Sequence, residues 1–102
     1  MQEHLKTILE EVEAGEAQLF DVREQEEWDE GHLKLAQLVP LSILRDYEAP
    51  EGLDQSKKTY IHCRSGQRVQ VAAPLLEEIG FSDVTALDEG FMELADEGFE
   101  EA

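Results

Sequence analysis

The sequence contains a single cysteine, Cys63, and its neighbours have the types and spacing that nucleophilic chemistry requires. It follows a short apolar run with the pattern of a buried strand, and helical spacing resumes a few residues later. The loop between them consists of Arg64, Ser65, Gly66, Gln67 and Arg68. Backbone N–H groups at the start of a helix favour an anion, and so they favour a thiolate over a thiol.

The composition of this loop distinguishes Cys63 from an inert cysteine buried at a strand end. Gly66 permits a positive φ or a close approach of the backbone. Arg64 and Arg68 are two of only 8 Lys and Arg residues in the chain, and the fork of Arg68 is suited to holding an anionic oxygen. Strand alternation sends the side chain of His62 to the opposite face. We therefore predict a thiolate activated by its loop rather than by a neighbouring base.

The hydrophobic pattern predicts the elements that position this loop. Short apolar runs predict strands at residues 17–22, 37–41, 59–62 and 84–87. Helical spacing predicts helices at residues 5–12, 24–30, 42–47, 69–79 and 91–95, with Ser42 as a cap and Pro74 costing a hydrogen bond or a kink. We expect residues 96–101 to form a frayed tail. The alternation predicts an α/β fold, a mostly parallel central sheet flanked by helices, in one domain over residues 1–102.

The charge of the chain excludes several classes of partner. It carries 25 Asp and Glu against 8 Lys and Arg, for a formal net charge of −17, so it would repel nucleic acids and anionic membranes. We find neither an apolar run of membrane-spanning length nor the pattern of a signal peptide. One cysteine cannot form an internal disulfide, which favours a reducing cytoplasm, and the scattered histidines give no metal-ligand spacing.

Several motifs together resemble the single-domain rhodaneses, a family of sulfurtransferases. The loop from Cys63 to Arg68 resembles the family's active-site loop. The N-terminal motif is matched by Asp21-Val22-Arg23, Glu27-Trp28, Gly31-His32-Leu33, Ala36 and Val39-Pro40-Leu41, and the C-terminal motif by Gly80-Phe81 and residues 84–90. The resemblance extends over roughly residues 2 to 99 and is specific because the cysteine loop and the Asp-Val-Arg motif occur together.

The resemblance implies both an architecture and an activity. It implies a sheet of about five strands, the additional short strand being expected near the N-terminus, and a persulfide that forms on Cys63. Asp21 and Arg23 are then expected to brace the loop. The implied partners are a small anionic sulfur donor such as thiosulfate and a thiol acceptor, either small or a protein. No metal or organic cofactor is implied.

The chain departs from the family pattern at five positions, which concern substrate preference and packing more than the class of reaction. Three of them replace residues that are usually small, one replaces a tryptophan, and one puts a proline in the active-site helix. They are Leu35, Val69, Glu89, Leu94 and Pro74.

Two alternatives to a sulfurtransferase follow from the same residues. A cysteine phosphatase is one, but such enzymes have a longer loop between cysteine and arginine than the one joining Cys63 to Arg68. The other is a non-catalytic module of the same fold that uses its acidic surface to dock a basic partner. The intact cysteine argues against this second alternative.

Overall fold

A parallel sheet of four strands forms the centre of the computed structural model, which describes all 102 residues. The strands lie in the order β2-β1-β3-β4, so the first and third strands are central and the fourth is at an edge. Their bounds are Ala17–Asp21 for β1, Ala36–Leu38 for β2, Lys58–His62 for β3 and Val84–Ala86 for β4. All three pairings are parallel, as the alternation of strands and helices predicts.

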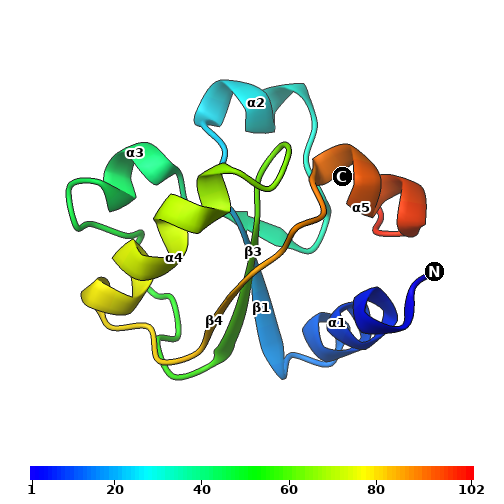
Figure 1. Ribbon diagram of the computed structural model, residues 1–102, viewed down its shortest axis with the longest axis horizontal. Helices are drawn as coiled ribbons and strands as arrows, with labels where there is room; N and C mark the ends of the chain where they lie inside the picture. Colours follow the sequence, from blue (N-terminus) through cyan, green and yellow to red (C-terminus); the bar gives the residue numbers. More distant parts are fainter.

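Five helices cover the sheet. Figure 1 shows α1 and α5 on one side, α3 and α4 on the other, and α2 above the end at which the strands finish. Their bounds are Glu3–Glu13 for α1, Gln25–Glu30 for α2, Leu41–Leu44 for α3, Arg68–Ile79 for α4 and Phe91–Glu97 for α5. No helix has both the length and the apolar character needed to cross a membrane.

The central strands are buried on both faces, which explains their continuous apolar sequence. Along β1 all five residues are buried. Leu19 packs with α1 and α5 in one core cluster, whereas its neighbour Phe20 packs with α3 and α4 in the other. Strand alternation thus divides the apolar side chains between two cores, one on each side of the sheet.

The expected fifth strand is absent. The residues near the N-terminus form α1, which begins at Glu3 and confirms the helix predicted at residues 5–12, and β4 has no strand on its outer side. The prediction for Ser42 was also wrong. Pro40 occupies the N-terminal cap position of α3, and the Ser42 hydroxyl donates a hydrogen bond to the Glu24 carboxylate at the start of α2. Pro74 lies within α4, which continues through it.

The C-terminal tail is ordered rather than frayed. Phe99 is only 3% exposed and joins the core cluster beneath α1 and α5. Beyond it, Glu101 forms an antiparallel bridge with Leu33, and the Ala102 N–H donates to the His32 carbonyl over 2.9 Å. The acidic residues of this tail face solvent while its backbone and its one aromatic side chain fix it to the fold.

We predict that Phe99→Ala lowers the free energy of unfolding by about 3 kcal/mol, because it empties a buried aromatic site. The matched control is Met92→Ala in α5, whose side chain is 63% exposed. This control should change stability by less than about 0.5 kcal/mol. Urea unfolding of the three proteins measures both values, and equal midpoints for Phe99→Ala and the wild type would contradict the packing of the tail.

Candidate active site

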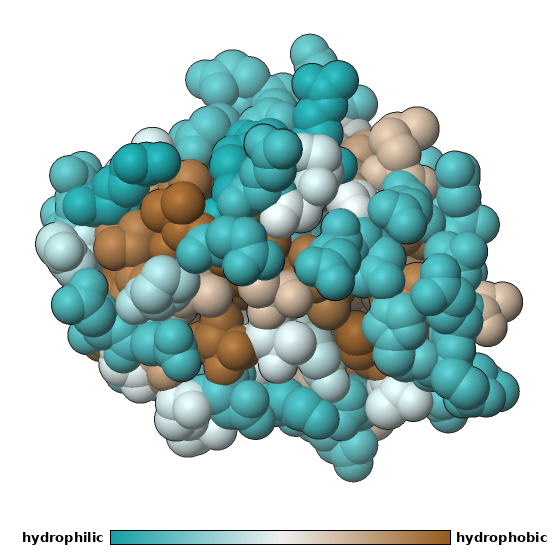
Figure 2. Space-filling view, in the orientation of Figure 1, coloured by the Kyte–Doolittle hydropathy of each residue, from teal (hydrophilic) through white to brown (hydrophobic).

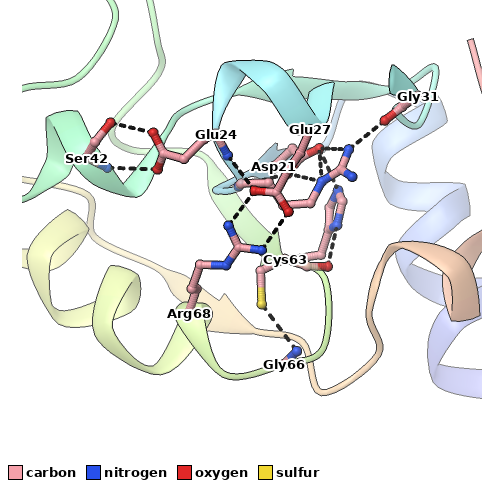
Figure 3. Close-up of polar contacts among 10 residues, drawn as sticks. Asp21, Glu24, Glu27, Gly31, Ser42, Cys63, Gly66 and Arg68 are labelled. Atoms are coloured by element: carbon pink, nitrogen blue, oxygen red, sulfur yellow. Dashed lines mark hydrogen bonds and ion pairs between the residues drawn. The ribbon is translucent and has the colours of Figure 1, made fainter. Parts of the chain in front are cut away.

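Cys63 lies immediately after β3. Figure 1 shows that this strand ends beneath α2. Its side chain is turned into the loop that follows, and the residue is only 1% exposed. The Gly66 N–H donates to the Cys63 sulfur over 3.2 Å (Figure 3). The loop thus curls back over the sulfur that precedes it.

Two opposing effects set the ionisation of this thiol. Burial raises the pKa of Cys63, because it removes water from the charged form. Backbone N–H groups of four residues lower it, and together they outweigh burial, so that the pKa of Cys63 falls below its ordinary value. These residues are Ser65, Val69, Gly66 and Arg68. The donors belong to the loop and the first turn of α4, so the anion is stabilised without a side-chain base.

Two glycines allow the loop to adopt this path. Gly66 has a φ of +84°, and a Cβ built there would lie 2.6 Å from the Asp88 carbonyl oxygen. A Cβ on Gly90 would lie 1.8 Å from the Arg64 carbonyl oxygen. Both distances are shorter than side-chain carbons tolerate. The loop backbone therefore packs directly on the segment between β4 and α5, with no room for a side chain between them.

The Arg68 guanidinium, which we expected to hold an anionic oxygen of a substrate, is bound to a side chain of this chain instead. Its two terminal nitrogens donate to the Glu27 carboxylate over 2.6 and 2.8 Å (Figure 3), so its fork is occupied rather than free to hold a substrate oxygen. The interaction lowers the pKa of Glu27 to about 2, hydrogen bonding by Arg68 being the largest cause. Glu27 was not singled out from the sequence as a site residue. The sequence did not identify the pairing because Glu27 lies in α2, far along the chain from Arg68 in α4.

Asp21 and Arg23 form a buried ion pair in which the guanidinium donates to both carboxylate oxygens. Arg23 also donates to the Gly31 carbonyl over 2.7 Å and lies 4.3 Å from the centre of the Phe91 ring. The Phe91 N–H in turn donates to the Cys63 carbonyl over 2.9 Å. The pair thus reaches the cysteine through Phe91, a residue that the sequence analysis did not identify.

His62 is fully buried. Its Nδ1 lies 3.4 Å from the Cys63 carbonyl oxygen, and its Nε2 has no hydrogen-bond partner. Burial lowers the pKa of His62 despite the nearby Asp21 carboxylate, so the imidazole is neutral at physiological pH. The neutral His62 ring therefore packs in the interior and is not placed to act as a base for the Cys63 thiol.

A hollow of about 390 Å³ opens beside the loop. Its lining residues are Arg23, Glu27, Glu30, Gly31, Arg64, Phe91, Met92 and Glu101. Arg23 in this lining is paired with Asp21, and the nearby Arg68 is paired with Glu27. The exposed Arg64 is therefore the one unpaired guanidinium at the mouth of the hollow. The surrounding carboxylates make the approach to the loop acidic.

Comparison with known proteins places this geometry in a family. The model of the rhodanese-like domain matches residues 4–97. The chain belongs to the rhodanese family. The chain is 36% identical over 90 residues to YqhL of Bacillus subtilis, covering 85% of this chain and 70% of that protein. It is 33% identical over 73 residues to the thiosulfate sulfurtransferase GlpE of Coxiella burnetii, covering 72% of this chain and 66% of that protein.

Other relatives are larger or share only the fold. The chain is 35% identical over 74 residues to the probable adenylyltransferase/sulfurtransferase MoeZ of Mycobacterium tuberculosis, which covers 72% of this chain but only 19% of MoeZ. The human single-domain sulfurtransferase TSTD1 superposes with a TM-score of 0.77 at 22% identity, covering 90% and 92% of the two chains. These comparisons confirm the rhodanese fold and a sulfurtransferase-type family.

The departures from the family pattern remove none of the backbone donors to the Cys63 sulfur. Leu35 is 37% exposed, whereas Val69 and Leu94 are fully buried and fill the core. The Glu89 carboxylate lies 2.7 Å from Nε2 of His4 in α1. Gly90 beside it allows the close approach of the backbone to the loop. The glycine that the backbone needs is therefore present.

We predict that Cys63 is alkylated by iodoacetamide with a midpoint below about pH 8.5, the value of a free thiol. The physical cause is the set of loop N–H groups that stabilise the thiolate. The rate of alkylation against pH measures the midpoint, and the same protein unfolded in urea is the control. A folded midpoint equal to or above the unfolded one would refute loop activation.

We predict that Glu27→Gln reduces stability at pH 7 by about 1 kcal/mol, because the lost pair is bidentate but partly exposed. The pKa of Glu27 is about 2 in the fold against an ordinary 4.5, so the pair stabilises above pH 4.5. The difference between wild type and variant should shrink as the pH falls from 4.5 towards 2. The control is Glu26→Gln on the exposed face of α2. A difference independent of pH would contradict the ion pair.

Proposed function

We propose that this rhodanese is a sulfurtransferase that carries a sulfane sulfur as a persulfide on Cys63. The observation that carries the proposal is the convergence of loop N–H groups on one buried thiol, which stabilises negative charge on a sulfur atom. The similarity to the thiosulfate sulfurtransferase GlpE supports the same chemistry.

The proposed reaction has two steps. In the first, the Cys63 thiolate attacks the outer sulfur of a donor such as thiosulfate, a sulfur–sulfur bond forms, and the donor's own sulfur–sulfur bond breaks to release sulfite. In the second, an acceptor thiolate attacks the outer sulfur of the Cys63 persulfide, takes it as a new persulfide and returns the Cys63 thiolate. Electrons balance without an external oxidant or reductant, and ping-pong kinetics follow.

The loop donors serve both steps. In the resting state they stabilise the thiolate, and after the first step they can hold the negative charge of the terminal persulfide sulfur. Arg64 supplies a guanidinium at the mouth for an anionic donor, because it is exposed and unpaired. Arg68 acts on the sulfur through its backbone N–H, because its guanidinium is bound to Glu27.

The acceptor is a thiol, small or carried by a protein. The name of MoeZ joins sulfur transfer to a second activity in one long polypeptide, which supports a protein acceptor, although this chain spans about a fifth of its length. A lone cysteine that works as a thiolate is suited to a reducing compartment, and we place the reaction in the cytoplasm.

A phosphatase is the competing use of a loop thiolate. The contacts of Gly66 with Asp88 and of Gly90 with Arg64 hold the loop against the segment between β4 and α5, so the loop cannot widen without moving that segment. The four residues between Cys63 and Arg68 leave less space than a tetrahedral phosphate requires. A non-catalytic docking module is less well supported, because every donor to the sulfur is in place.

We predict that wild-type protein treated with thiosulfate gains the mass of one sulfur atom, and that Cys63→Ser gains none. Serine preserves the size of the side chain but is ionised far less easily than cysteine. Intact-mass measurement before and after adding cyanide shows whether the sulfur is transferable.

The control for this experiment is circular dichroism of Cys63→Ser, which should match the wild type. Transfer of sulfur to cyanide by the folded variant would refute the role of Cys63. Turnover of an aryl phosphate by the wild type, with no sulfur gained, would instead establish the phosphatase.

A further inference from the structure

The outer edge of β4 presents hydrogen-bonding groups without a partner strand. The Thr59 N–H donates to the Asp83 carbonyl over 2.8 Å, and the Leu87 N–H donates to the Ile61 carbonyl over 2.9 Å. Residues 83, 85 and 87 therefore turn their backbone groups towards β3. Because these groups alternate along a strand, the N–H and C=O of Val84 and Ala86 point away from the sheet. Such an edge is a template for another strand.

The two sides of this edge differ in chemistry. Figure 1 is viewed from the β4 side, with β4 in front of the other strands, and Figure 2 shows pale and brown residues across the middle of the same face within a hydrophilic rim. On the α4 side the surface is apolar, because Leu75 of α4 and Val84 and Ala86 of β4 are only partly buried.

On the α1 side of the edge lies a groove of about 440 Å³ with an acidic end. It is bounded by α1, by Tyr60 of β3 and by the segment from Thr85 to Glu89. The acidic residues in its lining are Asp88 and Glu89, His4 also contributes to it, and neither lysine nor arginine does. His4 is engaged by Glu89, so the exposed Asp88 carboxylate has no cation beside it in the groove.

We propose that β4 docks an extended segment of a partner protein, in which basic and apolar residues alternate, as a fifth strand of the sheet. The segment's backbone pairs with Val84 and Ala86. Its apolar side chains lie on the α4 side, and its basic side chains enter the groove towards Asp88. Strand alternation makes one sequence pattern satisfy both surfaces.

A second copy of this chain is a poor occupant of the same edge. Two chains of net charge −17 repel each other, and pairing of the two edges would bring the acidic residues beside β4 of both copies together. A basic partner is attracted by the same field. Docking also places the partner near the rhodanese loop, because the Asp88 carbonyl at the end of this edge lies directly against Gly66.

The probe is a synthetic peptide of alternating lysine and valine with blocked ends. The matched controls are a peptide of alternating glutamate and valine, and the lysine peptide with N-methyl groups on the backbone nitrogens that face β4. We expect the lysine peptide to bind, to be weakened by salt, and to protect the N–H groups of Val84 and Ala86 against hydrogen exchange. The two control peptides should bind at least about tenfold more weakly, since they lose charge or backbone hydrogen bonds.

The matched variants are Ala86→Pro and Ala86→Ser. Proline removes the outward N–H but none of the bonds to β3, and an edge strand accepts it, so affinity should fall about tenfold. Serine keeps the N–H and should bind like the wild type. If the proline variant does not fold, the N-methylated peptide on wild-type protein still decides the question.

Three outcomes would overturn the proposal. One is no binding of the lysine peptide, and another is binding that leaves exchange at Val84 and Ala86 unchanged. The third is a dimer in sedimentation velocity with these N–H groups protected before any peptide is added, which would make a second copy the occupant. The measurement does not depend on sulfur transfer, because it can be repeated in Cys63→Ser with the same expected affinity.

Discussion

The site depends on a direct contact between two stretches of backbone. The loop after Cys63 packs on the segment between β4 and α5 so closely that Gly66 and Gly90 have no room for a side chain. This contact fixes the path of the loop, and the path brings its N–H groups towards the sulfur. Backbone donors stabilise a thiolate well only when they are rigid. In a mobile loop the N–H groups would bind water instead of the sulfur. The parallel sheet serves the chemistry by holding the ends of β3 and β4 side by side.

A second layer of contacts holds this backbone contact in place from the outside. The buried pair of Asp21 and Arg23 stacks against Phe91, whose N–H binds the Cys63 carbonyl. Glu27 binds Arg68 at the first turn of α4. In both pairs the guanidinium is bound by a carboxylate of this chain. The acidic residues of α2 have a structural use that their number alone would not suggest, since one of them fixes the active-site helix.

The sequence was most informative where one local pattern decides the structure. The continuous apolar run of β1 and the helical spacing after the cysteine loop led to the right elements, and the motif around Cys63 led to the right family. Contacts between distant segments were beyond its reach. Nothing local shows that Glu27 occupies the fork of Arg68, or that the acidic tail buries Phe99. The expected fifth strand was implied only by family resemblance and is absent, whereas the helical spacing of the same N-terminal region correctly predicted α1.

The strong negative charge of the chain and its preference for an anion at the active site are compatible because they act over different distances. Surface carboxylates act through water and salt, which screen them over about 10 Å at 0.1 M ionic strength. The loop N–H groups act within hydrogen-bond reach of a buried sulfur, where no salt intervenes. The net charge of −17 thus determines which molecules approach, and it favours basic protein surfaces over free anions. The loop determines what is stabilised on arrival, so for the sulfur transfer that we propose, a partner protein with a basic surface is better matched to this acidic chain than a dianion collected from solution.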